Sequence, residues 1–271
     1  MQKIIFMDID GTLVGFDGKI PDSTIEALKI AKQKGHQLVI CSGRSRFQID
    51  RQLVRYGFDG IVGASGAFLD IHEKEIYHYY MEEEKRKFLT DFLDENKITY
   101  SMQGEAGTRM NRHSAARLLQ RYHKVKLSKE RIDRFIGGTV IGKNTWEDPK
   151  LEKAVYYDSP FTVEEMQKHL SPFFDVVGAS FEKPDPTAGE IGIAGISKAT
   201  GMERYLKEVQ AKREQSIAFG DSHNDIEMLQ YAAVGVAMGN GQTMAKEAAD
   251  YVTDAIDQDG IYHAFEKLNI I

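Results

Sequence analysis

The chain has 271 residues, of which 42% are hydrophobic and 28% are charged, and this near-average composition excludes a chain that is disordered throughout. The 35 Lys and Arg residues are outnumbered by 41 Asp and Glu residues, so the net charge of −6 offers no excess of positive charge for a nucleic-acid backbone. No apolar run approaches the roughly 18 residues that span a bilayer, and the single cysteine, Cys41, has no partner for an internal disulfide, as is typical of a reducing compartment. We therefore expect a soluble cytoplasmic protein without a nucleic-acid or membrane partner, and its oligomeric state stays open.

The first third of the chain alternates short apolar runs with helical patterns. The apolar runs are typical of strands buried in a parallel sheet, and they cover residues 3–7 (KIIFM), 37–41 (QLVIC) and 60–64 (GIVGA). A helix is predicted between the first two runs, with Ser23 and Glu26 as its capping box and Gly35 at its end, and a second helix over residues 46–56. This βαβαβ order predicts an α/β fold with a doubly wound, Rossmann-like parallel sheet.

The last third repeats this rhythm, whereas the middle of the chain does not. In the last third, strands are predicted over residues 216–219, 234–238 and 251–253, and helices over residues 198–209, 223–231, 243–249 and 260–268. The middle has helical patterns at 82–95 and 162–170, strand-like runs at 98–103, 153–157 and 174–179, and a stretch rich in Arg and His. We therefore predict that an α+β domain, residues 82–187, is inserted into a core formed by residues 1–81 and 188–271.

Two aspartates follow the first predicted strand, in the segment Asp-Ile-Asp-Gly-Thr at residues 8–12. Ligand sites of open α/β sheets lie beyond the carboxyl ends of the strands, and alternate residues of an extended segment point the same way. We therefore expect Asp8 and Asp10 to face one site. Two neighbouring carboxylates repel each other, and a hard cation such as Mg²⁺, which prefers oxygen ligands, would relieve the repulsion. The segment favours a metal site over a solvated turn.

A second acidic segment, Gly-Asp-Ser-His-Asn-Asp at residues 220–225, follows another predicted strand and opens a helix. It brings Asp221, Asn224 and Asp225 to one strand–helix junction. One polar side chain is enough to cap a helix, so three of them indicate a role beyond capping.

Two further segments have features of phosphate contacts. Ser42-Gly43-Arg44 follows the second predicted strand, where a hydroxyl and backbone N–H groups suit an anion, although a helix cap at Ser42 explains the pattern as well. Lys198 lies in the first turn of a predicted helix, where the helix dipole disfavours a cation. An anion close to Lys198 would explain its position.

With these four segments in this order, the chain resembles the haloacid dehalogenase-like superfamily, and within it the Cof-like phosphatases, over essentially its whole length. The resemblance implies an α/β core with a large inserted cap. It also implies a Mg²⁺-dependent hydrolase of small phosphate monoesters that forms an aspartyl-phosphate intermediate. Two residues depart from the family pattern, because Ser65 stands where many members have Asn and Ala199 where Gly is common.

The same resemblance implies roles for individual residues. Asp8 corresponds to the nucleophile and Asp10 to the general acid and base. The expected metal-binding residues are Asp8, Asp10 through its backbone carbonyl, and Asp221, with Asp225 in support. The expected phosphate-binding residues are Ser42, Gly43, Arg44, Lys198 and Asn224.

Three alternatives stay open from the sequence. A phosphomutase on the same scaffold would retain the phosphate that a phosphatase releases. A phospho-signalling receiver would carry its phosphate acceptor after the third strand, where this chain has Ser65-Gly66-Ala67, and it would lack the second acidic segment. A non-catalytic phosphate-binding protein is disfavoured because every acidic position of the pattern is occupied.

The inserted domain is expected to decide which ester is hydrolysed, because binding sites between domains are common and a closing lid excludes water. Within it, Arg109, Arg112 and His113 form a polar group that suits an anionic or sugar substrate, although a solvated surface is the simpler explanation. Sugar phosphates, nucleotide-like phosphates and cofactor phosphates all stay open as substrates.

Overall fold

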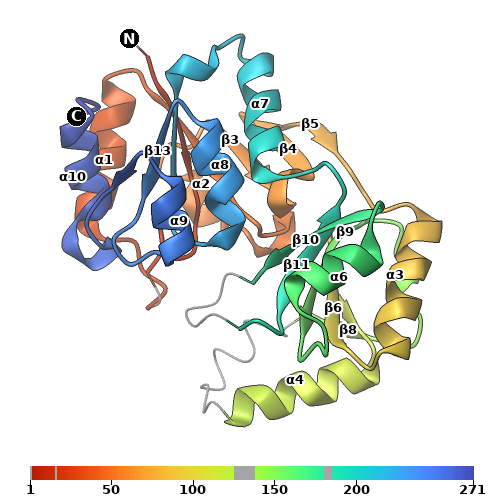
Figure 1. The fold of residues 1–271 in the computed structure, drawn as a ribbon. Helices are drawn as coiled ribbons and strands as arrows, with labels where there is room; N and C mark the ends of the chain where they lie inside the picture. The colour runs from red at the N-terminus through yellow and green to blue at the C-terminus, as the bar shows by residue number, and fades with distance from the viewer. Residues whose placement is uncertain (1, 16, 125–137, 180–184) are drawn as a thin grey trace. The chain divides into compact units, whose positions relative to one another are not determined.

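The chain folds into two units, each around its own sheet (Figure 1). The computed structural model describes all residues except 1, 16, 125–137 and 180–184. Unit 1 comprises Met1–Arg44, Ile49–His78 and Ile196–Ile271, and unit 2 comprises Ser45–Gln48 and Tyr79–Gly195. Most of unit 2 is therefore one continuous insertion between two parts of unit 1.

Unit 1 is built on an eight-stranded sheet with the strand order β14-β13-β12-β1-β2-β3-β4-β5. The strands are β1 (Ile4–Met7), β2 (Gln37–Cys41), β3 (Gly60–Gly63), β4 (Phe68–Ile71), β5 (Lys74–His78), β12 (Ser216–Gly220), β13 (Val234–Ala237) and β14 (Tyr251–Val252). The strands from β14 to β3 run parallel, and β4 and β5 add an antiparallel hairpin at one edge. All four residues of β1 are buried, as expected for a central strand that is covered on both faces.

Helices cover both faces of this sheet. They are α1 (Asp22–Gln33), α2 (Arg51–Val54), α7 (Lys198–Glu208), α8 (Ile226–Tyr231), α9 (Thr243–Ala248) and α10 (Gly260–Lys267). Apolar residues of α1, α2 and α10 pack on one face, and those of α7, α8 and α9 pack on the other (Figure 1). None of the helices in the described part of the chain has the length and apolar character needed to cross a bilayer.

The strand order reverses at β1, which lies between β12 and β2. From β1 the chain passes through α1 to β2 on one side, whereas β12 reaches the other side of β1 from the last third of the chain. Ligands of open α/β sheets bind at such a reversal, beyond the carboxyl ends of the strands. Asp8 is the first residue after β1 and therefore lies at this point.

Unit 2 is built on a six-stranded sheet with the strand order β10-β11-β9-β6-β7-β8. Its strands are β6 (Thr99–Gly104), β7 (Gly107–Met110), β8 (Val140–Ile141), β9 (Leu151–Tyr157), β10 (Phe174–Gly178) and β11 (Gly189–Ile193), and its helices are α3 (Glu83–Glu95), α4 (Arg112–Lys124) and α6 (Val163–Leu170). All neighbouring strands are antiparallel except β7 and β8.

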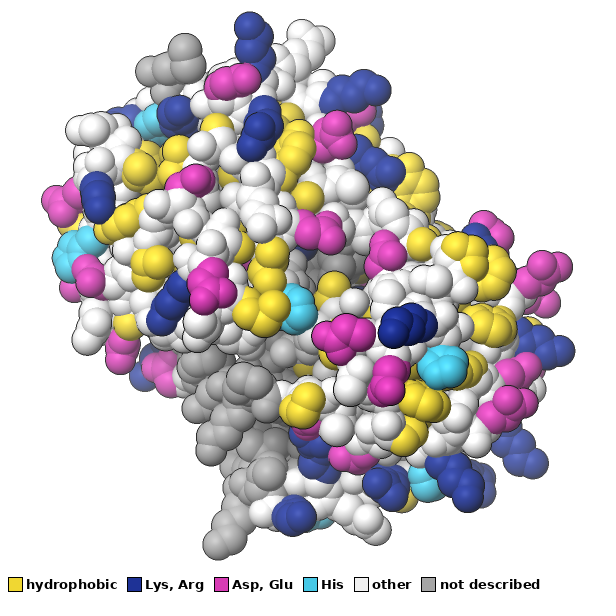
Figure 2. All heavy atoms as spheres, in the orientation of Figure 1, with side chains coloured by type: hydrophobic (Ala, Val, Ile, Leu, Met, Phe, Trp, Pro, Cys, Tyr) yellow, Lys and Arg dark blue, Asp and Glu magenta, His cyan; other side chains and the backbone are white. Residues whose placement is uncertain are grey.

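The helices of unit 2 lie on opposite faces of its sheet. Tyr156 of β9 belongs to the core formed with α3 and α6, whereas the next residue, Tyr157, packs with Leu118 of α4. Successive residues of a strand point to opposite faces, so α4 covers the face opposite to α3 and α6. Figure 2 shows Lys and Arg side chains gathered over the end of unit 2 that carries α4, the helix formed by the Arg- and His-rich stretch.

The structure confirms the predicted fold class, an α/β parallel core with an inserted α+β domain, but several elements differ. The predicted helix over residues 46–56 is replaced by a 3₁₀ turn at Arg46–Gln48 and the short helix α2. In the 3₁₀ turn, the Gln48 side chain binds the backbone at the start of the same turn, because its Oε1 accepts a hydrogen bond from the Ser45 N–H at 3.0 Å. The predicted capping box of α1 is wrong, since no side chain caps this helix and the Ser23 hydroxyl donates to Asp259 Oδ1 instead, at 2.5 Å.

The hairpin of β4 and β5 was not predicted, nor were β7, β8 and β11. The turn between β4 and β5 has His72 and Glu73 at φ +48° and +63°. A two-residue hairpin turn with positive φ at both central residues is of type I′, which usually contains Gly, Asn or Asp there. Because none of these residue types is present in this turn, the sequence lacks the usual signal for a hairpin.

Candidate active site

Three loops that carry predicted site residues leave the sheet of unit 1 at the same edge. Asp8 follows β1, Ser42 follows β2 and Asp221 follows β12. Because β1 pairs in parallel with both β2 and β12, the carboxyl ends of the three strands are neighbours. Segments from the first and last thirds of the chain therefore meet at one place.

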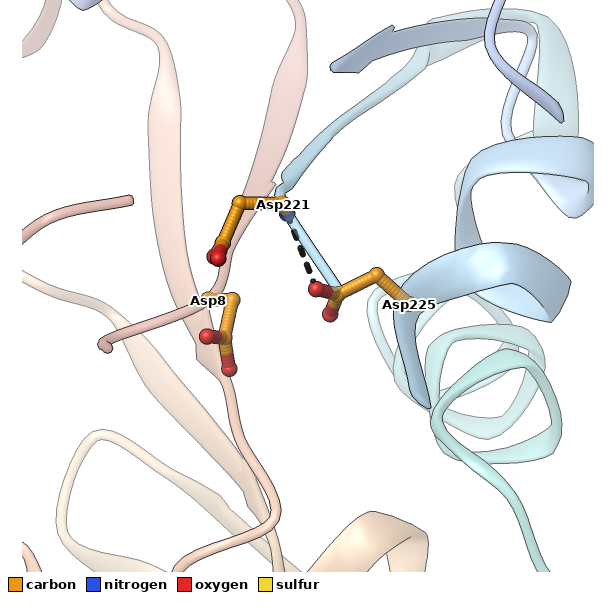
Figure 3. A group of neighbouring side chains, drawn as sticks. All are labelled: Asp8, Asp221 and Asp225. Atoms are coloured by element: carbon orange, nitrogen blue, oxygen red, sulfur yellow. Dashed lines mark hydrogen bonds between the residues drawn. The ribbon is translucent and has the colours of Figure 1, made fainter. Parts of the chain in front are cut away.

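Asp8, Asp221 and Asp225 form a buried acidic cluster at this edge (Figure 3). A carboxylate oxygen of each lies within 4.8 Å of the others. The three residues are 5%, 7% and 0% exposed, respectively. Carboxylates are rarely buried this deeply unless they are paired or bind a metal, so the cluster indicates a binding function.

Asp225 uses both of its oxygens to organise the cluster. Oδ2 accepts hydrogen bonds from the N–H groups of Asp221 and Ser222, both at 3.0 Å, and the first of these is the dashed line in Figure 3. Oδ1 accepts a hydrogen bond from Lys198 Nζ at 2.6 Å. Asp225 therefore shapes the turn after β12 and binds the neighbouring lysine.

Lys198 is 1% exposed and links Asp225 to Asp8, whose Oδ1 lies 2.7 Å from Nζ. It begins α7, where the N-cap residue Ser197 accepts a hydrogen bond from the Thr200 N–H. Burial by itself lowers the pKa of Lys198, but the carboxylates of Asp225 and Asp8 outweigh burial and raise the pKa above its usual value. The anion that the sequence analysis expected near this lysine is the pair of carboxylates.

The unpaired oxygens of the cluster suit a divalent cation. Burial, together with repulsion between the aspartates, raises the pKa of Asp8 to about 7 and that of Asp221 to about 8. Oδ2 of Asp8 and Oδ2 of Asp221 accept no hydrogen bond from any described residue, and the Lys198 ammonium pairs with Asp8 and Asp225 but not with Asp221. Hard cations prefer carboxylate oxygens, so the donor set fits a metal such as Mg²⁺.

The raised pKa values predict that Mg²⁺ binds more tightly at high pH. A carboxyl whose pKa in the folded state lies above the unfolded value of about 3.9 stabilises the fold below that value, and this stabilisation is lost as the pH rises through the folded pKa. The metal-free protein should therefore lose stability between about pH 4 and pH 8. Because Mg²⁺ must displace the retained protons, we expect its Kd to be at least about tenfold weaker at pH 6 than at pH 8.

Thermal unfolding with and without Mg²⁺ at both pH values tests this expectation. Mg²⁺ should raise the Tm more at pH 8 than at pH 6, and Asp221→Asn should lose most of the increase. A rise in Tm of the same size at both pH values would contradict the linkage between metal and protons.

The turn after Asp8 is shaped around Asp221. Gly11 has φ +82°, and a Cβ atom at this position would lie only 2.4 Å from Asp221 Oδ2, so a side chain would be both strained and too close. Thr12, which the sequence analysis did not single out, donates from its hydroxyl to Asp221 Oδ1 at 2.9 Å. The sequence signal for Thr12 was its position in the segment of residues 8–12, which also contains the two predicted site aspartates.

The Asp10 side chain lies outside the acidic cluster. Its carboxylate accepts two hydrogen bonds from Arg44, at 2.8 Å from Nε and 2.6 Å from Nη2, and is about half exposed. Since β1 ends at Met7, Asp10 belongs to the turn beyond the strand, and the alternation of an extended segment does not govern its direction. Arg44, expected at the phosphate, thus binds Asp10 in this structure.

The other predicted phosphate contacts lie beside these groups. Asn224 Oδ1 is 3.4 Å from Lys198 Nζ and accepts a hydrogen bond from the Ser222 hydroxyl at 2.9 Å. Ser42 is buried, and its Oγ accepts a hydrogen bond from the Arg44 N–H at 3.3 Å. Gly43 is buried, and its N–H donates to no described residue.

The two arginines proposed from the sequence for substrate contact lie in unit 2. Arg109 of β7 forms an ion pair with Asp148, at 2.6 Å between Nε and Oδ2. Arg112 is exposed at the first position of α4. The structure therefore brings Asp8, Lys198, Asp221, Asn224 and Asp225 together, and it gives Arg109 a partner within its own unit.

The comparison with known families identifies the class of protein. A family model of haloacid dehalogenase-like hydrolases matches residues 5–265, so the chain belongs to this family. The chain is similar to the Bacillus subtilis protein YkrA, with 29% identity over 100% of this chain and 99% of that protein. It is also similar to the 5-amino-6-(5-phospho-D-ribitylamino)uracil phosphatase YcsE of Bacillus subtilis, with 27% identity over 97% of this chain and 94% of that protein.

A solved structure extends the comparison to three dimensions. The chain is similar to the haloacid dehalogenase subclass IIB sugar phosphatase BT4131, with a TM-score of 0.79, 30% identity and full coverage of both chains. The protein is accordingly a haloacid dehalogenase-like phosphatase of the Cof-like group, a hydrolase of phosphoric monoesters that acts on small phosphorylated substrates. The mixed sheet of unit 2 forms its cap, and the resemblance stated from the sequence is confirmed.

Proposed function

We propose that the enzyme is a Mg²⁺-dependent phosphatase in which Asp8 attacks the phosphorus atom of a small phosphate monoester. The observation that carries the proposal is the setting of the Asp8 carboxylate. It is buried at the strand reversal, with Oδ1 held by Lys198 at 2.7 Å and Oδ2 without a hydrogen bond from the described residues. A carboxylate has two oxygens, so Asp8 can bind the metal with one and attack with the other.

The proposed reaction has two steps. In the first, an Asp8 oxygen bonds to phosphorus, the bond from phosphorus to the alcohol oxygen breaks, and Asp10 donates a proton to the leaving alcohol. In the second, a water oxygen bonds to phosphorus and the water gives a proton to Asp10, while the bond between the Asp8 oxygen and phosphorus breaks, so inorganic phosphate leaves and both aspartates are restored. Mg²⁺, held by Asp8 and Asp221, would offset the negative charge of the phosphoryl oxygens.

Other residues of the site would bind and orient the phosphoryl group. The Ser42 hydroxyl and the Gly43 N–H are donors at the end of β2. The positive charge of Lys198 would offset the repulsion between the Asp8 carboxylate and a dianionic substrate. Asn224 would add an amide donor, because its oxygen already faces Ser222 and Lys198 and its nitrogen is left for an acceptor.

We propose a sugar phosphate or a cofactor phosphate as the substrate. The support comes from the names of two relatives, a sugar phosphatase and a phosphatase of a phosphoribitylamino-uracil. Measuring phosphate release over a panel of such monoesters with Mg²⁺ tests the proposal, and release should stop in excess EDTA and return with Mg²⁺. Full activity after removal of the metal would refute it, and transfer of phosphate within the substrate without release would indicate a phosphomutase.

Arg109 and Arg112 are proposed to influence which ester is preferred. We expect Arg112→Ala to change the ratio of kcat/KM between a bis-phosphorylated and a mono-phosphorylated ester by about fivefold, the size of one charge-assisted hydrogen bond at an exposed site. Arg109→Ala should also destabilise the cap, because it leaves Asp148 without its ion pair. Lys168→Ala in α6, which removes an exposed cation elsewhere in unit 2, is the matched control. An unchanged substrate ranking in both arginine variants would assign these residues to the solvated surface.

A further inference from the structure

The side chain of Asn240 connects two turns that are far apart in the sequence. Asn240 lies just after β13 and is half-buried. Its amide nitrogen donates to the Gly11 carbonyl at 2.8 Å, and its amide oxygen accepts from the Ile256 N–H at 2.8 Å. Both ends of the amide are therefore used, and each binds backbone rather than another side chain.

The backbone of the same turn contacts the second acidic segment. The Gln242 N–H donates to the Asp221 carbonyl at 2.7 Å. A Cβ atom at Gly241 would lie 2.9 Å from the same carbonyl oxygen, so the two backbones are in close approach. The turn over residues 239–242 thus touches both acidic segments, the first through the Asn240 side chain and the second through its backbone.

The Gly11 carbonyl belongs to the turn that receives the Asp221 carboxylate. Gly11 lies against Asp221 Oδ2, and the next residue, Thr12, donates to Asp221 Oδ1. A shift of this turn would move both contacts at once. The hydrogen bond from Asn240 restrains the turn from outside the strand, since β1 has already ended at Met7.

We infer that Asn240 is a positioning residue, which holds the Gly11–Thr12 turn so that the Asp221 carboxylate is placed to bind the metal. The inference rests on the proposed function for the identity of that metal. An asparagine suits the task because one short side chain supplies a donor to Gly11 and an acceptor to Ile256. An aspartate at this position would lack the donor, and an alanine would lack both groups.

Isothermal titration of the metal-free protein with Mg²⁺, in the absence of substrate, tests the inference. Asn240→Ala is expected to weaken Mg²⁺ binding about fivefold or more, as for the loss of one buried hydrogen bond that fixes a ligand. The matched control is Thr253→Val, which removes a buried hydrogen bond to the Gly260 carbonyl in the same region without any contact to Gly11. Thr253→Val should lower the Tm and leave the Mg²⁺ Kd within about twofold of the wild type.

A double-mutant cycle with Thr12→Val then asks whether Asn240 acts through the turn. If it does, Asn240→Ala should have little further effect on the Mg²⁺ Kd once the hydroxyl of Thr12 is gone, because both changes release the same carboxylate. Where Asn240→Ala does not fold, Asn240→Asp replaces it, since it keeps the acceptor for Ile256 and loses the donor to Gly11. It should still weaken Mg²⁺ binding, although its added negative charge alone would strengthen it.

Two results would overturn the inference. One is an unchanged Mg²⁺ Kd in the Asn240 variant, and the other is an equal weakening in Thr253→Val at a similar loss of Tm, which would indicate general destabilisation. Neither result depends on hydrolysis. Failure of every ester in the panel, with Mg²⁺ binding and the Asn240 effect intact, would instead reject the proposed substrate class and leave the positioning role standing.

Discussion

Replacing Asp8 by asparagine is expected to lower kcat by a factor of about 10³ or more, which corresponds to about 4 kcal/mol in the transition state. The amide nearly preserves the volume of the carboxylate but is a poor nucleophile and a weaker metal ligand. The fold should persist, because Lys198 keeps its ion pair with Asp225 at 2.6 Å. Since burial raises the pKa of Asp8 to about 7, removing its charge at pH 8 should not lower the Tm of the metal-free protein.

The measurements are single-turnover phosphate release and thermal unfolding of the same preparations. Asp254→Asn is a matched control, because it makes the same chemical change at an exposed aspartate that pairs with His263. Its kcat should stay within about twofold of the wild type. An Asp8→Asn variant that retains more than about a tenth of the wild-type kcat would reject Asp8 as the nucleophile.

Replacing Asp10 by asparagine is expected to cost about 10² to 10⁴ in rate, the usual contribution of a general acid and base. In the first step the loss should be smaller for aryl phosphates than for alkyl phosphates, because an aryl oxide leaves without much protonation. In the second step the loss should persist for both, since water must still be deprotonated. The affinity for Mg²⁺ should change much less than in Asp221→Asn, because the Asp10 carboxylate lies outside the acidic cluster and binds Arg44.

Single-turnover rates with an alkyl and an aryl phosphate, together with a Mg²⁺ titration, separate these effects. Arg44→Gln serves as the comparison, since it leaves the Asp10 carboxyl in place but removes the side chain that holds it at 2.6 and 2.8 Å. Equal losses in the first step for both leaving groups would count against Asp10 as the acid. A loss of Mg²⁺ affinity as large as in Asp221→Asn would make the Asp10 side chain a metal ligand.

The parallel core could be predicted from the sequence because its elements are decided locally. A run such as IIFM in β1 is apolar at every position, and such a composition is typical of a strand covered on both faces. The helices of the last third were likewise predicted from the repeated alternation of strands and helices, and α7 and α8 lie close to the predicted ranges. The hairpin of β4 and β5 was missed, because its turn uses His72 and Glu73 at positive φ in place of the residues that signal such turns.

The candidate site divides in the same way. The acidic residues were recognised because each lies at the end of an apolar run, where the chain by itself predicts a strand and a ligand-facing loop. The directions in which their side chains point could not be predicted from the sequence. The Asp10 carboxylate binds Arg44, because β1 ends before Asp10 and no longer sets the direction of its side chain. The Ser23 hydroxyl binds Asp259 rather than its own helix, because packing brings Asp259, the residue before α10, close to α1.

The sequence alone determined the class of this protein, through four short segments in a fixed order and an apolar pattern that alternates strands with helices. What it could not determine is which of those segments touch. Lys198 binds both Asp8 and Asp225 because α7 begins beside Cys41 at the end of β2, from where the lysine side chain reaches both carboxylates. Asn240 likewise reaches Gly11 from the last third of the chain. Only the tertiary structure decided these contacts. A side-chain hydrogen bond requires the donor–acceptor distance to be correct to within a few tenths of an ångström. That distance is set by the packing of whole elements, and no local sequence pattern predicts it.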